Sequence, residues 1–323
     1  MVKPPPVAST LAAAGSSAAA WSDAAFAPRK RARDAVCSRT GYSSAAVDRA
    51  LDRLFEPLTA AALGATIAAE LGTLGVLDGF VERPGVGRVR ALPLGRVCVI
   101  SSRTTVGVAL IPAIFALCAN CDVLVKDRED GLVAAFFDTL AETLPALRER
   151  MRARAWRGDD DAIDLHGFDG VVAFGSDATL ERISALLPFS RTFVAYPNKT
   201  SAGYVAREDL CDETAAAAIA RAAAHDALLY DGEGCLSLHL LFVERGARVT
   251  PERFGQLLGR AFDDAARTDA ALRSASGGAA RAMARDLAAF RGSSTTYADP
   301  QCSYLVTVDP PEHVDPLLLP RTL

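Results

Sequence analysis

The stretch RVCVISSRTTVGVALIPAIFALCANCDVLVK, residues 96–126, predicts a strand, a helix and a second strand. RVCVIS (96–101) and DVLVK (122–126) are short runs rich in β-branched residues, and GVALIPAIFALCA (107–119) is an apolar segment of helical length. Apolar strands without polar alternation are typical of parallel strands that are buried on both faces. The stretch therefore predicts one βαβ unit of a parallel sheet.

The same alternation continues toward the C-terminus. We expect a helix over 131–153, a strand at 170–174, a helix at 177–187 and a strand at 192–196. Ligands of such sheets bind outside the carboxyl ends of the strands, so the loops at 101–105, 126–130, 175–178 and 196–201 are the candidate binding loops. Lys126 comes at the end of its strand, and we expect its ammonium to project into that crevice.

The flanking regions predict a mostly helical arm and a second α/β region. Residues 1–27 read as a floppy or weakly helical arm, and 44–71 predict helix with an N-cap at Ser43 or Ser44 and a break at Pro57. RPGVGRVRALPLG (83–95) reads as a boundary or a β-turn region. After the sheet we expect a helix over 212–229, a strand over 238–244, a helix over 251–268 and a strand over 303–309. The expected domains are 1–80, 81–196 and 197–323.

Composition places the chain among ordinary globular proteins. Of 323 residues, 50% are hydrophobic and 23% are charged, and the formal net charge is -4, which gives no reason to expect a nucleic-acid partner. The basic run RKRAR (29–33) reads as a solvated helix face. No apolar run is long enough for a transmembrane span, and the N-terminus lacks the apolar core of a signal peptide. Seven Cys, an odd number, indicate reduced thiols and a cytoplasmic location.

Several common chemistries lack their motifs. The sequence has no G-x-S-x-G elbow, no H-E-x-x-H zinc motif, no phosphate-binding P-loop and no G-x-G-x-x-G fingerprint. Cys118 and Cys121 form a C-x-x-C without a second pair, so we interpret them as structural and expect no metal site.

The remaining candidate is Cys235, in YDGEGCLSLHLLFV (230–243). It is either an inert buried thiol or a nucleophile. Gly232 and Gly234 let the backbone approach a ligand, the N–H of Cys235 can stabilise an oxyanion, and a thiolate attacks thioester or aldehyde carbonyls. His225 is expected on a helix surface rather than as a base.

Four segments in this order resemble the aldehyde dehydrogenase superfamily, and most closely the long-chain acyl-CoA reductases of the bacterial bioluminescence (LuxC) type. RTGYSSAAVDRALDRLFEPLTAAALGATIAAELG (39–72) is similar to the helical leader of those reductases, and residues 93–130 to the first cofactor segment. VVAFGSDATLERI (171–183) is similar to the second cofactor turn. YDGEGCLSLHLLFVE (230–244) matches the D-Q-x-x-C-x-S nucleophile motif at Asp231, Cys235 and Ser237, with Gly232 in place of the Gln.

The resemblance implies an α/β, aldehyde-dehydrogenase-like fold with a parallel-sheet cofactor domain, an α/β catalytic domain and a helical N-terminal arm. It implies NAD(P)H as cofactor, an acyl-CoA or aldehyde substrate and a homo-oligomer. Lys126 and Glu129 would contact the adenosine ribose, Gly175 and Ser176 would lie near the phosphates, and Ser102 is a further cofactor candidate in the first loop. Glu129 favours NAD over NADP, because a carboxylate repels a 2′-phosphate.

Three departures from the family pattern bear on function. The oxyanion-holding Asn of the first loop is replaced by Ser102 or Arg103. The E-L-G-G stretch, whose Glu activates water, is replaced by AYPNKTSAG (195–203), which fits a reductase. No E-x-F-G-P-type strand follows Cys235, so we expect a truncated or trimmed chain.

Three functions remain open at this point. The first is reduction of an acyl-CoA to an aldehyde, in which Cys235 attacks the thioester and hydride transfer follows. The second is an aldehyde dehydrogenase or acyl-phosphate reductase of the same superfamily. The third is a non-catalytic binding or assembly member.

Overall fold

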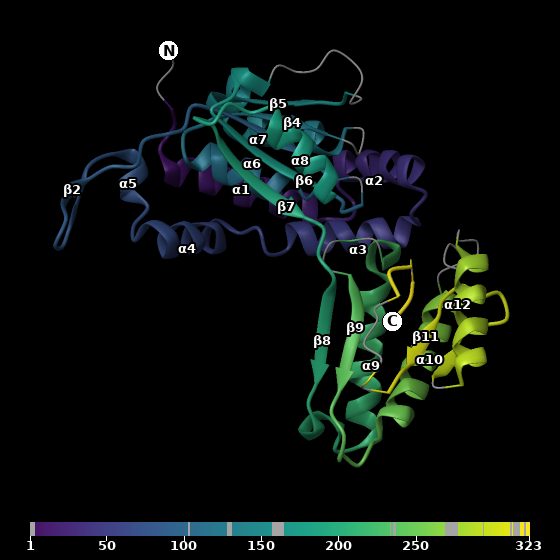
Figure 1. The fold of residues 1–323 in the computed structure, drawn as a ribbon. Coiled ribbons are helices and arrows are strands. Elements are labelled where there is room, and N and C mark those ends of the chain that lie inside the picture. Colours follow the sequence, from purple (N-terminus) through teal and green to yellow (C-terminus); the bar gives the residue numbers. More distant parts are fainter. Residues whose placement is uncertain are drawn as a thin grey trace. The chain divides into compact units, whose positions relative to one another are not determined.

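The computed structural model describes residues 4–102, 104–127, 131–156, 165–232, 234, 237–268, 277–292, 294–310, 312, 317–319 and 321–323. The chain divides into two compact units, Met1–Asn198 and Lys199–Leu323. The first unit is built on a parallel sheet (Figure 1).

That sheet has five strands in the order β5-β4-β3-β6-β7, and every neighbouring pair is parallel. The strands are β3 (Arg96–Ile100), β4 (Asp122–Lys126), β5 (Met151–Arg154), β6 (Gly170–Gly175) and β7 (Thr192–Pro197). Ile100 at the end of β3 lies opposite Lys126 on one side and Ala173 on the other. The predicted parallel α/β architecture is therefore confirmed.

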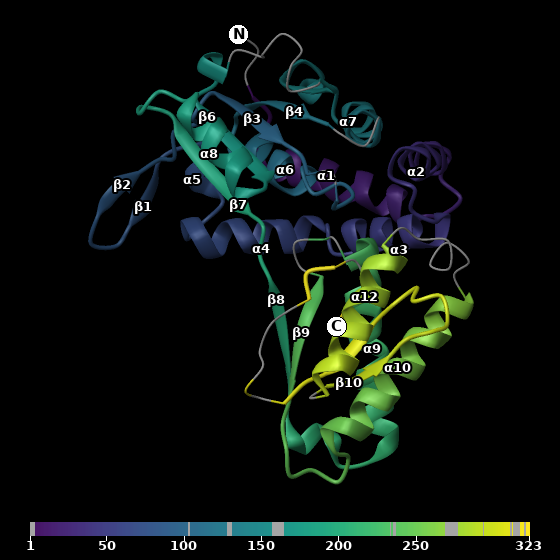
Figure 2. The ribbon, with the colours of Figure 1, turned by 45° about the vertical axis from the view of Figure 1, so that its right-hand side comes forward.

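Helices cover both faces of the sheet. Cys98 and Ile100 of β3 and Ala173 of β6 pack with Leu180 of α8 (Asp177–Ala185), and Figure 2 shows α8 against β6 and β7. The alternate residues of the strands, such as Val99, are also fully buried. They face α6 (Leu110–Cys118) and α7 (Leu132–Thr143), since right-handed crossovers place these helices opposite α8.

The N-terminal helices pack on the same unit. They are α1 (Val7–Ser22), α2 (Ala27–Thr40), α3 (Ser44–Phe55), α4 (Ala60–Leu71) and α5 (Gly75–Asp78). Trp21 of α1 is 0% exposed and donates from Nε1 to Thr139 Oγ1 of α7 at 3.1 Å. Of the two alternatives expected for residues 1–27, a floppy or a weakly helical arm, the floppy one is wrong for residues 7–22, which form a packed helix. Small side chains weaken the hydrophobic pattern of α1 but allow close packing: a Cβ added at Gly15 would lie 2.7 Å from Ala60 N.

The caps and breaks of these helices follow the sequence signals. Ser43 Oγ accepts from Ala46 N at 3.1 Å and caps α3, as predicted.

The basic run RKRAR (29–33) is only partly a solvated face, because Arg29 is 1% exposed. Its guanidinium donates to Trp21 O at 2.9 Å and pairs with Asp52 Oδ1 at 2.7 Å. A buried arginine with these partners ties α2 to α1 and α3.

The single helix expected over 131–153 is wrong at its C-terminal end. α7 stops at Thr143, a 3-10 helix runs over Pro145–Arg150, and β5 follows. Pro145 cannot donate the backbone hydrogen bond that would continue α7. β5 lies at the edge of the described sheet, where it pairs only with β4. An edge strand can carry polar residues, so its sequence does not show the apolar run by which the other strands were predicted.

A hairpin and a bent helix pair complete the first unit. Strands β1 (Val81–Arg83) and β2 (Gly87–Val89) pair antiparallel, and only the turn and β2 lie within the predicted turn region 83–95. The hairpin projects from the unit in Figures 1 and 2. Within the described ranges no single helix is long and apolar enough to cross a membrane. The pair α3 and α4 reaches the required length and hydropathy only together, and the two helices are bent by 57°.

The second unit packs helices on a two-stranded parallel sheet. Its elements are β8 (Ser201–Val205), a 3-10 turn (Arg207–Leu210), α9 (Glu213–Leu228), a second 3-10 turn (Leu229–Gly232), β9 (Leu238–Val243), α10 (Pro251–Thr268), α12 (Gly278–Arg291), β10 (Thr295–Tyr297) and β11 (Val306–Val308). β8 pairs with β9, and β10 pairs antiparallel with β11. α9, β9 and α10 confirm the prediction, whereas β8, α12 and β10 were not predicted and β11 is shorter than expected.

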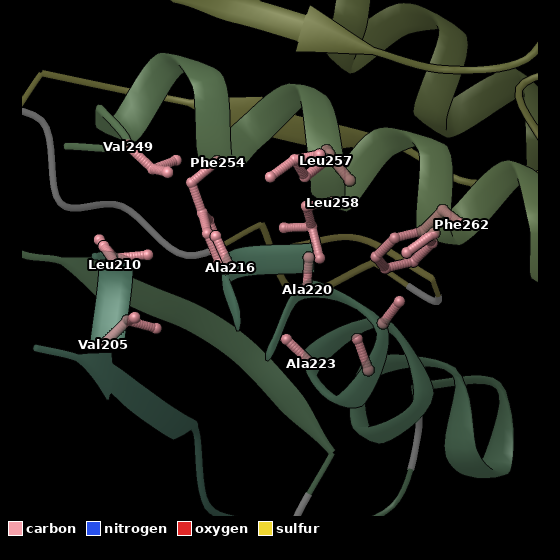
Figure 3. Packing of buried hydrophobic residues seen from close by; sticks show 14 of the residues in the cluster. Val205, Leu210, Ala216, Ala220, Ala223, Val249, Phe254, Leu257, Leu258 and Phe262 are labelled. Atoms are coloured by element: carbon pink, nitrogen blue, oxygen red, sulfur yellow. The ribbon is translucent and has the colours of Figure 1, made fainter. Parts of the chain in front are cut away.

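The core of this unit lies between α9 and α10. An alanine face of α9, including Ala216, Ala220 and Ala223, packs against Phe254 and Phe262 of α10 (Figure 3). Alanine has no side chain beyond Cβ, so the large side chains of α10 fill the space between the two helices. This packing fixes α9, whose C-terminal end leads into the segment of Cys235.

Candidate active site

Four of the predicted cofactor residues lie at the carboxyl edge of the five-stranded sheet. Ser102 follows β3, Lys126 ends β4, Gly175 ends β6, and Ser176 stands between β6 and α8. These strands are neighbours in register, so the loops that leave them are about 5 Å apart at their origins. Arg103 and Glu129 lie outside the described residues.

Ser102 holds the first loop together. Its Oγ lies 3.0 Å from Thr104 Oγ1 and accepts from Thr104 N at 3.2 Å. Tyr42 Oη, from the N-terminal helical region, donates to Thr104 O at 3.1 Å. The first loop is thereby tied both to itself and to the N-terminal region, and the role of Ser102 in cofactor binding stays a prediction.

Lys126 is buried rather than extended into open solvent. It is 8% exposed, and its Nζ lies 5.0 Å from the ring centroid of Trp156, which follows β5. The indole face attracts the ammonium. The ammonium therefore stays at the sheet edge, but beside Trp156 instead of projecting freely as expected. Its charge opposes the effect of burial on Cys98, whose thiol has its pKa raised to about 12.

Asp127 is a buried carboxylate that the sequence reading missed. It is 4% exposed, and its Oδ2 accepts from Val133 N in the first turn of α7 at 3.3 Å. A carboxylate near a helix N-terminus is favoured by the helix dipole. Its position just before the periodic segment of α7 is the signal that could have found it.

Gly175 and Ser176 form the turn into α8. Ser176 is the N-cap: its Oγ accepts from Thr179 N at 3.4 Å and lies 3.0 Å from Thr179 Oγ1. A Cβ added at Gly175 would come within 3.3 Å of the Thr179 side chain, so a small residue suits this turn. The first N–H groups of α8 form the type of terminus that binds phosphate. Asp177 also lies in this first turn and adds a negative charge there.

Described residues on both sides of Cys235 are hydrogen-bonded, whereas Glu233, Cys235 and Leu236 lie outside the described residues. Gly234 N donates to Ser237 Oγ at 3.0 Å, and Ser237 Oγ donates to Leu229 O at 3.0 Å. Ser237 is 3% exposed, so this hydroxyl bridges the two sides of the segment in a buried position. The family motif contains this Ser, but its bridging contacts could not be read from the sequence.

Gly232 occupies a position that excludes the Gln of the family motif in this backbone conformation. Its φ is +76°, and a Cβ there would lie 2.9 Å from Arg321 N and 3.1 Å from Ala227 O. Both atoms belong to the backbone, so no side chain can turn away to make room. The departure from the motif is therefore a local structural requirement.

The structure also places two other groups that the sequence analysis considered. His225 lies on α9 with a partly exposed side chain, and its Nδ1 is 3.6 Å from Asp226 Oδ1. Cys118 and Cys121 are buried free thiols, and burial raises the pKa of Cys118 to about 12. In the part of the chain that the structure covers, no group of three or more His, Cys, Asp or Glu could hold a metal ion.

Solved structures with a similar fold are aldehyde dehydrogenases. The NAD-dependent benzaldehyde dehydrogenase of Corynebacterium glutamicum has 16% identity and a TM-score of 0.62, over 94% of this chain and 67% of that one. The succinic semialdehyde dehydrogenase of Streptococcus pyogenes, solved with NADP+, has 12% identity and a TM-score of 0.62, over 93% and 67%. The putative aldehyde dehydrogenase PutA of Anabaena variabilis has 20% identity and a TM-score of 0.53, over 80% and 57%.

At these identities the likeness shows the fold alone, and this chain spans between 57% and 67% of the length of those three proteins. The expected aldehyde-dehydrogenase-like fold is confirmed. No curated protein matches the sequence significantly. The sequence matches the acyl-CoA reductase (LuxC) family over residues 2–309, from the N-terminal helices to the last strand. The chain belongs to the acyl-CoA reductase (LuxC) family.

Proposed function

We propose that this protein reduces an acyl-CoA thioester to an aldehyde with NAD(P)H, through an acyl-enzyme on Cys235. One observation carries the proposal. The family match over residues 2–309 includes both the loops at the carboxyl edge of the sheet and Cys235. The free thiols of the described residues favour a reducing compartment, and we place the protein in the cytoplasm.

The residues at the sheet edge fit a dinucleotide. A helix N-terminus, such as the one after β6, is the group that binds a pyrophosphate in open α/β sheets. The ammonium of Lys126 at the end of β4 can donate hydrogen bonds to ribose hydroxyls. We assign Lys126 and Glu129 to the adenosine ribose, the Gly175 and Ser176 turn to the phosphates, and Ser102 to the first loop of the site. When bound, NAD(P)H supplies the hydride.

Cys235 does the covalent chemistry. Its thiolate attacks the thioester carbonyl, a new C–S bond forms, and the old C–S bond breaks to release the CoA thiolate, which takes up a proton. The backbone N–H of Cys235 stabilises the oxyanion. After hydride transfer to the acyl carbon, the Cys235 thiolate leaves and the aldehyde is released.

Retention of the acyl group on Cys235 is supported by the sequence of β7 and the loop that follows it. Residues 195–203, which stand in place of the E-L-G-G stretch, contain no carboxylate. Without that base, this stretch cannot activate a water to hydrolyse the acyl-enzyme. The site is therefore suited to reduction rather than to oxidation of an aldehyde.

The test is acyl-CoA-dependent oxidation of NAD(P)H by Cys235→Ser, with Cys211→Ser as the control for an exposed cysteine of the same unit. We expect Cys235→Ser to lose activity at least a thousandfold and Cys211→Ser to keep it. Unchanged turnover of Cys235→Ser would exclude the assignment. Parallel assays with an acyl phosphate and a free aldehyde separate the other chemistries of the superfamily. Failure to bind NAD(H) in calorimetry would favour the non-catalytic alternative.

A further inference from the structure

An aromatic pair stands at the carboxyl end of β6 and β7, the last two strands of the five-stranded sheet. Phe174 is the last residue but one of β6, and Tyr196 holds the same position in β7. The two residues are direct partners in the parallel ladder. Their rings are stacked, with centroids 4.6 Å apart and an angle of 11° between the ring planes.

The pair lies on the face of the sheet opposite α8. Phe193 of β7 packs with Leu180 of α8, and side chains alternate along a strand, so Tyr196 projects to the other face. On that face α6 packs over β3 and β4, and α7 over β5. Over β7 the same face is open, since Val194 is 40% exposed and Tyr196 is 49% exposed. A ligand at this end of the sheet can therefore reach the Tyr196 ring.

The order of the strands sets the direction in which a dinucleotide crosses this edge of the sheet. The adenosine ribose is assigned to Lys126 at the end of β4, and the pyrophosphate to the turn after β6. β3 lies between these two strands, so β4 and β6 are about 10 Å apart. The group beyond the pyrophosphate is the nicotinamide riboside. Continuing in the same direction brings it to β7, the next strand and the last of the sheet (Figure 1).

A stacked pair at a sheet edge also has a purely structural use, since cross-strand aromatic pairs stabilise the strands that carry them. Two observations favour a ligand in addition. Tyr196 leaves about half of its surface exposed at the end of the sheet where ligands bind. The pair also adjoins the turn assigned to the phosphates, because Pro197, the residue after Tyr196, lies opposite Gly175 in the ladder.

From this placement, and resting on the proposed function, we infer that the nicotinamide ring stacks on Tyr196, which Phe174 holds in position. Offset stacking of two planar rings stabilises a complex beyond the area that it buries. One face of the Tyr196 ring is covered by Phe174, and the exposed part of the ring is left for the ligand. Because Phe174 already orders this ring, little conformational freedom is lost on binding.

The test compares the affinities of the full chain for NADH and for ADP-ribose by calorimetry. ADP-ribose keeps the adenosine, the pyrophosphate and the second ribose but lacks the nicotinamide ring. If the unsubstituted protein prefers NADPH, the pair is NADPH and 2′-phospho-ADP-ribose. The variants are Tyr196→Ala, which removes the ring, and Tyr196→Phe, which keeps it. Val194→Ala is the matched control, because Val194 is exposed on the same face of β7 but lies two residues farther from the carboxyl end.

We expect Tyr196→Ala to weaken binding of the reduced dinucleotide roughly threefold to tenfold and to leave the ligand without nicotinamide unchanged. Tyr196→Phe and Val194→Ala should bind both ligands as the unsubstituted protein does. Equal weakening of both ligands by Tyr196→Ala would mean that the pair only supports the sheet edge and would overturn the inference, as would no weakening of either. A loss in Tyr196→Phe as large as in Tyr196→Ala would also overturn it, because the ring would then not be the binding group. If the unsubstituted protein binds neither NADH nor NADPH, the proposed function fails, and the inference fails with it.

Discussion

Gly232 gives the sharpest prediction for the segment that carries Cys235. With φ at +76°, any residue with a Cβ would cost roughly 1–2 kcal/mol there. The added Cβ would also lie 2.9 Å from Arg321 N, a backbone atom, and overpacking of this kind costs about 1–3 kcal/mol. We therefore expect Gly232→Ala to lower the free energy of unfolding of the second unit by roughly 2–5 kcal/mol.

Gly246→Ala is the matched control in the same unit. Gly246 also has a positive φ, +88°, but no atom lies within 4 Å of an added Cβ. It should therefore lose only the conformational part, about 1–2 kcal/mol. Urea unfolding followed by circular dichroism gives both values, provided that the m-values agree.

Two outcomes of that experiment would refute the reasoning. The first is equal destabilisation by Gly232→Ala and Gly246→Ala, because the contact with Arg321 would then have no energetic effect. The second is a stable, active Gly232→Gln variant. This variant restores the family residue, and we expect it to be at least as destabilised as Gly232→Ala and to gain no activity.

Three further predictions concern stability and thiol reactivity. Trp21→Ala should lower the free energy of unfolding by about 3–5 kcal/mol, because Trp21 is fully buried and bonded to Thr139; a loss below about 1 kcal/mol in urea unfolding would contradict the packing of α1. Burial raises the pKa of Cys98 and Cys118 to about 12, so both thiols stay protonated in the folded state while unfolded thiols ionise above about pH 8.5. The free energy of unfolding should therefore fall as pH rises from about 8.5 toward 12. At pH 8.5, iodoacetamide should alkylate the exposed Cys211 well before either buried thiol, and comparable rates by mass spectrometry would contradict this.

The parallel sheet was predictable where its strands are buried on both faces. β3, β4 and β6 read as continuous apolar runs, and this pattern admits few alternatives. β5 was not found, because an edge strand of alternating arginines resembles the end of a charged helix. β8 was also missed, since its Gly203 and exposed Tyr204 weaken the strand pattern.

The candidate site was predictable to the level of its loops. Ligands of parallel sheets bind outside the carboxyl ends of the strands, and this generalisation depends only on strand order. It therefore placed Lys126, Gly175 and Ser176 at one edge of the sheet. Contacts such as Lys126 with Trp156 could not be predicted, because they join side chains that are distant in the sequence. The requirement for Gly at position 232 could not be predicted either, because it depends on contact with the backbone of Arg321, which is distant in the sequence.

The assignment of Cys235 as nucleophile is tested most directly by the mass of the protein after incubation with an acyl-CoA in the absence of NAD(P)H. Without hydride the acyl group should remain on the enzyme, so we expect the mass to increase by one acyl group. Peptide mapping should locate that group on Cys235, and the increase should be absent in Cys235→Ser. An unmodified protein, or an acyl group on the exposed Cys211 instead, would contradict the account.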